Sequence, residues 1–326
     1  MPTTPALSTF DTRPATHSDI PVLTRMLDSC SRRYLDRPTE PDEVADRLAT
    51  PGSDPRHDSL LVADAADDVV GFGHGWPVGD AEIRCFARVH PDARGRGVGT
   101  LLLTRLRARA AEHVLRPAAA PVLTATNWAA DEQAGPLFRA LGFTEQRFFL
   151  RMTADLRDGP AAAAHWPAGV QVREFRDHAD DDALFAAFAE AFADHWGQQR
   201  PDRSQWWYDH RDSASAAFDP TLWFLATDGG EIAGFVLGTA EQTTGQISQL
   251  GVRPRWRGRG LGAALLAHAL DTFTGRGLDQ ARLTVDTANV TTALRLYLKA
   301  GMRPEPAFTI WGTPLHAARL DTPPSA

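Results

Sequence analysis

The feature that most constrains this sequence is a glycine-rich hexapeptide that occurs twice. Its two copies are Arg94-Gly95-Arg96-Gly97-Val98-Gly99 and Arg257-Gly258-Arg259-Gly260-Leu261-Gly262. Each copy follows a Val-x-Pro sequence and precedes a leucine-rich stretch that favours a helix. Glycines in a strand-to-helix turn let the backbone approach a ligand closely, and the first N–H groups of the helix favour an anion. The repeat therefore predicts a duplicated domain, with a turn in each copy that suits the pyrophosphate of a nucleotide cofactor.

Length and composition agree with two globular domains. The chain has 326 residues, of which 43% are hydrophobic and 23% charged, and no apolar run approaches the length of a membrane span. The N-terminus carries no secretion signal, so we expect a cytoplasmic protein without a membrane partner. Two cysteines, Cys30 and Cys85, give neither a disulfide framework nor a metal cluster. The net charge of −7 argues against nucleic acid as a partner. The oligomeric state is left open.

The two halves share one order of elements. Each is predicted to contain a strand, a helix, a strand hairpin, the strand before the glycine turn, the turn with its helix, a further strand and a final helix. A Gly-Pro-Ala-rich stretch between the halves lacks a clear period and is interpreted as a linker. We therefore divide the chain into a first domain at residues 1–153, a linker at 154–169 and a second domain at 170–326.

A second motif identifies the family that the sequence resembles. Asn289, Ala293, Leu296-Tyr297 and Gly301 follow the pattern Asn-x-x-x-Ala-x-x-Leu-Tyr-x-x-x-Gly. With the Arg-x-x-Gly-x-Gly turn, this pattern resembles the GNAT superfamily of acyl-CoA N-acyltransferases, once in each half. The resemblance implies an α/β (α+β) fold of two tandem domains, each a mixed, mostly antiparallel sheet flanked by helices. A dinucleotide site is disfavoured, because its Gly-x-Gly-x-x-Gly spacing follows the first strand of a βαβ unit.

The resemblance also implies acetyl-CoA as the cofactor. The residues that would bind it in the second half are Leu250, Gly251 and Val252 on the strand, Arg257, Gly258, Arg259, Gly260, Leu261 and Gly262 in the turn, and Asn289. Their counterparts in the first half are Val89, Arg94, Gly95, Arg96, Gly97, Val98 and Gly99. In the family the strand before the turn separates from its neighbour and exposes backbone N–H groups to the acetyl carbonyl. The arginine side chains fit either phosphate contacts or a solvated basic rim.

Tyr297 occupies the family's general-acid position, where a phenol protonates the departing thiolate. The matching residue of the first half is Phe138, which has no proton to donate, and Gly135-Pro136 interrupts the same helix. We therefore expect the second domain to catalyse and the first to be a degenerate copy. Whether the first domain binds CoA is left open.

The general base is harder to assign. The family often uses a glutamate on the strand before the glycine turn, but residues 246–252 contain no carboxylate. The candidates are Asp286 at the end of the next strand, Glu241 before the strand, and water held by Ser248 or Gln249. We favour Asp286, whose alternative role is to cap the loop that follows it.

The acceptor is expected near an aromatic stretch after the second half's first helix. The predicted substrate contacts are His195, Trp196 and Trp207, which would form an aromatic and acidic entrance for a cationic amine. The same stretch is equally typical of a helix that packs on the sheet. The sequence most resembles two-domain actinobacterial acetyltransferases, which implies a small-molecule amine as substrate: an antibiotic, an amino sugar or a cysteinyl amine of a thiol precursor. Protein or peptide N-acetylation, a non-catalytic CoA sensor or scaffold, and aminoacyl-tRNA-dependent transfer are the alternatives.

Overall fold

The computed structural model describes residues 10–35, 38–79, 81–113, 121–157, 159, 164–193 and 202–315. The chain forms two compact units. Unit 1 comprises Met1–Arg147 together with Phe308–Ala326, and unit 2 comprises Phe148–Ala307. Within the described ranges, none of the helices combines the length and apolar character that crossing a membrane requires.

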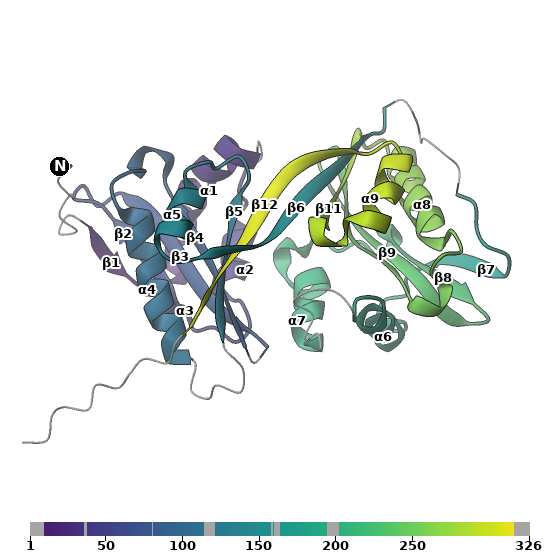
Figure 1. The fold of residues 1–326 in the computed structure, drawn as a ribbon, viewed down its shortest axis with the longest axis horizontal. Helices are drawn as coiled ribbons and strands as arrows, with labels where there is room; N and C mark the ends of the chain where they lie inside the picture. The colour runs from purple at the N-terminus through teal and green to yellow at the C-terminus, as the bar shows by residue number, and fades with distance from the viewer. Residues whose placement is uncertain are drawn as a thin grey trace, which may run out of the picture. The chain divides into compact units, whose positions relative to one another are not determined.

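Unit 1 is a mixed sheet covered by helices (Figure 1). Its strands are β1 (Asp11–Arg13), β2 (Ser59–Ala63), β3 (Val69–Val78), β4 (Glu82–Val89), β5 (Val122–Trp128) and the end of β12 (Arg303–Pro314), in the order β1-β2-β3-β4-β5-β12. Its helices are α1 (Ile20–Leu35), α2 (Pro41–Leu48), α3 (Pro55–Asp58), α4 (Val98–His113) and α5 (Ala134–Ala140). Only the β4–β5 pair is parallel among these described strands.

Unit 2 repeats this plan. Its strands are β6 (Thr144–Asp155), β7 (Val170–Glu174), β8 (Trp223–Asp228), β9 (Glu231–Glu241), β10 (Thr244–Val252) and β11 (Gln280–Asp286), in the order β6-β11-β10-β9-β8-β7. Its helices are α6 (Asp181–Ala191), α7 (Arg203–Trp207), α8 (Leu261–Gly275) and α9 (Val290–Lys299). The β10–β11 pair is parallel and the other described pairs are antiparallel. The predicted fold class, two mixed and mostly antiparallel sheets with helices, is confirmed.

The units do not follow the expected division at 1–153, 154–169 and 170–326, because two strands are exchanged. Strand β6 precedes the linker, yet from Phe149 onward it pairs with β11 of unit 2. Strand β12 follows unit 2, yet from Phe308 onward it pairs with β5 of unit 1. Local alternation of side chains predicts that a segment is a strand, but it does not specify which sheet edge the strand joins.

The buried core of unit 2 fixes the position of β10, the strand that precedes the glycine turn. Trp223 on β8 and Phe235 on β9 are fully buried, and their rings pack against Trp206 of α7 and Phe188 of α6. Strand β10 fits closely against this core, because a side chain at Gly251 would collide with the ring of Phe235. This close approach fixes the position of β10 and of the turn that follows it.

Candidate active site

Strands β10 and β11 separate at the point where the site lies. Their parallel pairing runs from Thr244–Gln280 to Ile247–Leu283 and then ends, although both strands continue. Strand β10 stays paired with β9, with Ser248 inserted as an extra residue in its register. A bulge of this kind bends the strand and increases its twist. The result is a gap between β10 and β11 along residues 249–252.

Backbone N–H groups of β10 face this gap. The N–H of Arg253 donates to the carbonyl of Ala233 on β9. Because N–H directions alternate along a strand, the N–H groups of Leu250 and Val252 point the other way, into the gap. Two donors are thus held in place beside the open edge of β10.

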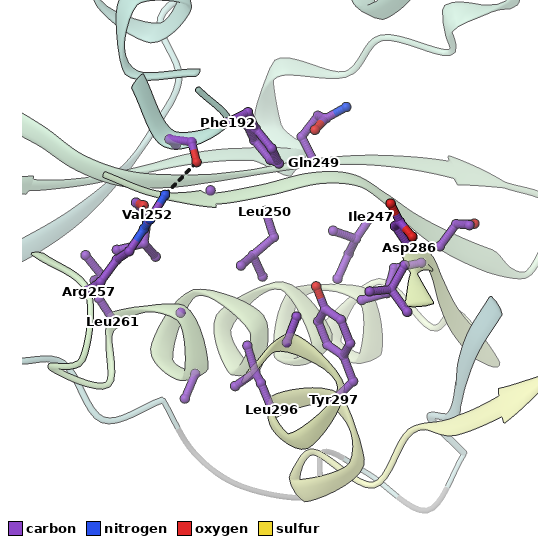
Figure 2. Close-up of a pocket in the computed structure, with 18 of the residues that line it drawn as sticks. Phe192, Ile247, Gln249, Leu250, Val252, Arg257, Leu261, Asp286, Leu296 and Tyr297 are labelled. Carbon is purple, nitrogen blue, oxygen red and sulfur yellow. Dashed lines mark hydrogen bonds between the residues drawn. The ribbon is translucent and has the colours of Figure 1, made fainter. Parts of the chain in front are cut away.

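A cavity of about 770 Å³ occupies this region of unit 2 (Figure 2). Ten of the residues predicted to act at the site line it: Leu250, Gly251, Val252, Arg257, Gly258, Gly260, Leu261, Gly262, Asp286 and Tyr297. Ala191 and Phe192 at the end of α6 line the side near the turn, and Phe149 of β6 also contributes. Arg259 is exposed and is not among the residues of the wall.

The glycine turn closes one end of the cavity. Gly258 and Gly260 have φ values of 75° and 84°, and a Cβ on either would meet no atom within 4 Å. Their requirement for glycine is therefore conformational and does not come from crowding. Helix α8 begins at Leu261, and its first N–H groups have no acceptor within the helix. A helix start of this kind is electropositive and suits an anion.

Arg257 is engaged with backbone carbonyls. Its Nε donates to the carbonyl of Val252 at 3.1 Å, and a terminal nitrogen donates to the carbonyl of Ala191 at 2.7 Å (Figure 2). The guanidinium therefore joins the glycine turn to the last residue of α6. A cation is favourable there because the carbonyl end of a helix is partially negative.

Tyr297 reaches the same cavity from α9. The residue is 8% exposed, and its hydroxyl makes no hydrogen bond among the residues that the structure describes. Figure 2 shows the ring rising from α9 with the hydroxyl aimed towards β10. Burial raises the pKa of Tyr297 to about 12. The phenol is thus protonated at neutral pH and has a proton to donate.

The two candidate bases lie in different places. Asp286 ends β11 on the cavity wall, and its Oδ1 accepts a hydrogen bond from the N–H of Ala288 at 2.8 Å. It therefore faces the cavity and also caps the following turn. Glu241 is exposed, is not among the wall residues, and lies opposite Thr244 at the far end of the β9–β10 hairpin. Glu241 is close in sequence to β10 but far from the gap, because the hairpin turn is at the opposite end of β10.

Of the three predicted acceptor contacts, the structure describes Trp207, which does not line the cavity. Trp207 is 5% exposed, packs against Phe175 and Trp223, and is not among the wall residues. The alternative interpretation, in which this tryptophan packs against the sheet, therefore describes Trp207. His195 and Trp196 lie outside the described residues, as does the side chain of Asn289.

Two residues near the site were missed by sequence reasoning. Phe149 lies on β6 before the linker and reaches the cavity only because that strand is exchanged. His210 lies within 3.3 Å of the Gln249 amide although 39 positions separate them in sequence. A histidine in an aromatic stretch gives no signal of such a contact, and the π-helical turn Tyr208–Asp212 that places it has no simple sequence signature.

In unit 1 the corresponding gap is filled. Pairing of β4 with β5 also ends early, at Cys85–Ala125. Arg88 directly precedes the valine of the first Val-x-Pro sequence, as Gly251 precedes that of the second. Its guanidinium donates a hydrogen bond across the gap to the carbonyl of Thr126 at 3.2 Å. Its guanidinium lies over the rings of Phe86 and Trp128. A long, half-buried side chain therefore occupies the space that is open in unit 2.

The glycine turn of unit 1 has also acquired an internal partner. Gly95 and Gly97 keep positive φ values of 72° and 89°. Arg94, however, makes two hydrogen bonds of 2.6 Å to the carboxylate of Asp131. Its guanidinium also lies over the ring of Tyr34. The turn keeps its backbone geometry, but its first arginine is committed to this ion pair.

Both halves match models of one family. Residues 56–145 match the model described as Acetyltransferase (GNAT) domain, and residues 182–302 match Acetyltransferase (GNAT) family. With the separated strands and the paired glycine turns, this makes the chain a tandem member of the GNAT acetyltransferase family, whose members use acetyl-CoA. The predicted family, the enzyme class and the cofactor are confirmed.

Two similar proteins carry the same name. The chain is 35% identical to the mycothiol acetyltransferase of Acidothermus cellulolyticus, over 69% of this chain and 68% of the relative. It is 36% identical to the mycothiol acetyltransferase of Thermobispora bispora, over 77% of this chain and 80% of the relative. A GCN5-related N-acetyltransferase from Sphaerobacter thermophilus has a similar structure, with a TM-score of 0.76, 27% identity, and coverage of 94% of this chain and 96% of that one.

Proposed function

We propose that this chain transfers the acetyl group of acetyl-CoA to the primary amine of a small molecule, and that unit 2 alone carries out the reaction. One observation carries the proposal. A single cavity joins the glycine turn to a protonated phenol that has no hydrogen-bond partner among the described residues, and the corresponding gap in unit 1 is filled by Arg88. The N-acetyltransferase activity itself follows from the family.

The residues of unit 2 fit the parts of acetyl-CoA. The start of α8 and the turn before it suit the pyrophosphate, and the open edge of β10 suits the extended arm that ends in the thioester. Acetyl-CoA supplies an activated acyl group. The N–H groups of Leu250 and Val252 would stabilise the negative charge that develops on the acyl oxygen as the new C–N bond forms.

Proton transfers would complete the reaction. When the C–S bond breaks, Tyr297 would donate its proton to the departing sulfur. The attacking amine must be neutral, and an amine with a pKa of about 9 costs roughly 2.7 kcal/mol to deprotonate at pH 7. Asp286 faces the same cavity and is the carboxylate that we propose as the acceptor of this proton, directly or through water.

The names of the relatives suggest the acceptor. Proteins at 35% and 36% identity are named mycothiol acetyltransferase. We therefore propose the deacetylated form of mycothiol, a small molecule with a free amine, as the first acceptor to test.

The test is an acetylation assay with product analysis by mass spectrometry. Purified protein and acetyl-CoA are incubated with deacetylated mycothiol, glucosamine, cysteine amide or a peptide with a free N-terminus. The proposal requires acetylation of a small amine at a rate that clearly exceeds that of the peptide. Preference for the peptide would instead support a peptide N-acetyltransferase. Binding of acetyl-CoA without turnover of any amine would support a sensor or scaffold.

A further inference from the structure

His210 makes a hydrogen bond through each of its ring nitrogens. Nδ1 lies 2.8 Å from the carbonyl oxygen of Trp206, one helical turn earlier. Nε2 lies 3.3 Å from the side-chain nitrogen of Gln249 on β10. The imidazole also stacks on the indole of Trp206, with ring centroids 4.6 Å apart. The ring is therefore fixed in position and in orientation.

These partners determine the direction of both hydrogen bonds. A carbonyl oxygen only accepts, so Nδ1 must carry the proton and donate to Trp206. In a neutral imidazole Nε2 then has a lone pair and accepts from the amide NH2 group of Gln249. Burial lowers the pKa of His210, which keeps the ring neutral at pH 7. The amide oxygen of Gln249 is consequently turned away from His210.

Gln249 lines the cavity that also contains Tyr297 and the open edge of β10. It is part of the cavity wall, immediately after the bulge at Ser248. Figure 2 shows Gln249 and Phe192 on one side of β10 and Tyr297 on the other, so the amide and the phenol flank the gap from opposite sides. Among the residues that the structure describes, none donates a hydrogen bond to the Gln249 amide oxygen. The matching residue of unit 1, three positions before the valine of Val-x-Pro, is Phe86, which cannot accept one.

We propose that the amide oxygen of Gln249 accepts a hydrogen bond from an N–H of the attacking amine, and that His210 is the positioning residue that holds the amide in this orientation. The proposal rests on the proposed function of unit 2 and adds a residue pair that selects the acceptor. An amine nitrogen that donates to Gln249 keeps its lone pair free to attack the acyl carbon. Gln249 takes no proton in this role, so the proposal is compatible with Asp286 as the base.

A double-mutant cycle tests the pair. His210→Phe keeps a ring to stack on Trp206, and Gln249→Leu keeps the approximate side-chain volume. We expect each change to raise KM for deacetylated mycothiol about fivefold to tenfold and to leave KM for acetyl-CoA within about twofold. Because His210 acts through Gln249, the double variant should be no worse than Gln249→Leu alone. Multiplying effects, or an unchanged KM for the amine, would overturn the proposal.

A matched control and a measurement without the acceptor complete the design. His268→Phe changes another partly buried histidine of unit 2, on α8 beside Phe224, and should leave both KM values unchanged. In ¹⁵N-labelled wild-type protein, the imidazole shifts of His210 should show a protonated Nδ1 and an unprotonated Nε2. The opposite tautomer would disprove the orientation of Gln249 even if an amine is acetylated. Failure of every amine in the assay would instead disprove the proposed function.

Discussion

Trp311 stacks on Phe138, with ring centroids 5.3 Å apart and ring planes 11° from parallel. Phe138 holds in unit 1 the motif position that Tyr297 holds in unit 2, four residues before the glycine that ends the helix. The indole of Trp311 also donates to the side-chain oxygen of Asn127 at 2.6 Å. The position that supplies a proton in our proposal for unit 2 is therefore part of the packed core in unit 1.

Trp311→Ala should destabilise unit 1. The change removes a fully packed indole and leaves the side-chain oxygen of Asn127 without this donor, so we expect a loss of about 3–5 kcal/mol in the free energy of unfolding. Denaturant unfolding followed by circular dichroism measures the loss. Leu298→Ala, at a side chain that is 47% exposed, serves as the control and should stay within about 0.5 kcal/mol of wild type.

Tyr297→Phe should lower kcat by about 10²-fold or more and leave the fold intact, because only the proton donor is lost. Steady-state rates with acetyl-CoA and an accepted amine provide the measurement. Tyr34→Phe in unit 1 is the matched control and should leave kcat unchanged. An active Tyr297→Phe enzyme would show that the departing thiolate is protonated by another group.

The same tyrosine predicts a pH profile. The protonated phenol is the active form, and burial places its pKa at about 12, so it loses its proton only as the pH rises towards that value. The rate should therefore show no alkaline decline from this group between pH 7 and about pH 10. A plot of kcat against pH tests this, and a decline centred near pH 9 would contradict the assignment.

Gly260→Ala and Gly97→Ala form a matched pair. Both glycines have positive φ, 84° and 89°, and in both cases a Cβ would meet no atom within 4 Å. Each alanine should cost about 1–2 kcal/mol in backbone strain. Only Gly260→Ala should weaken acetyl-CoA binding, because the gap beside the first turn is filled. Isothermal titration calorimetry should give one site per chain, and two sites would show that the filled gap does not prevent unit 1 from binding acetyl-CoA.

Asp286→Asn separates the two roles of that residue. The asparagine oxygen can still accept from the N–H of Ala288, so the turn and the stability should be preserved. The amide cannot take a proton from the amine, and we expect kcat/KM for the amine to fall about 10²-fold at pH 7. Thermal unfolding provides the control. Unchanged kinetics would leave capping as the function of Asp286.

The sequence was most informative where function depends on a few adjacent residues. Gly258 and Gly260 could be predicted because glycine is the residue that most readily adopts a positive φ. Tyr297 could be predicted because it belongs to a motif with fixed spacing. Trp207 was predicted to contact the acceptor but is buried, because helices that pack in a core and binding-site entrances are both rich in aromatic residues. The contact of His210 with Gln249 depends on tertiary packing, as does the strand exchange, and local patterns do not encode either.

The strand exchange has a consequence for the history of the chain. The last strand of each sheet is encoded in the opposite half of the gene, so a deletion that removes one half also takes a strand from the other. Under the proposal that unit 2 alone catalyses, the first copy remains indispensable, because β6, which begins in it, pairs with β11 of unit 2 and brings Phe149 to the cavity. Selection on catalysis in one copy thus preserves the scaffold of the other.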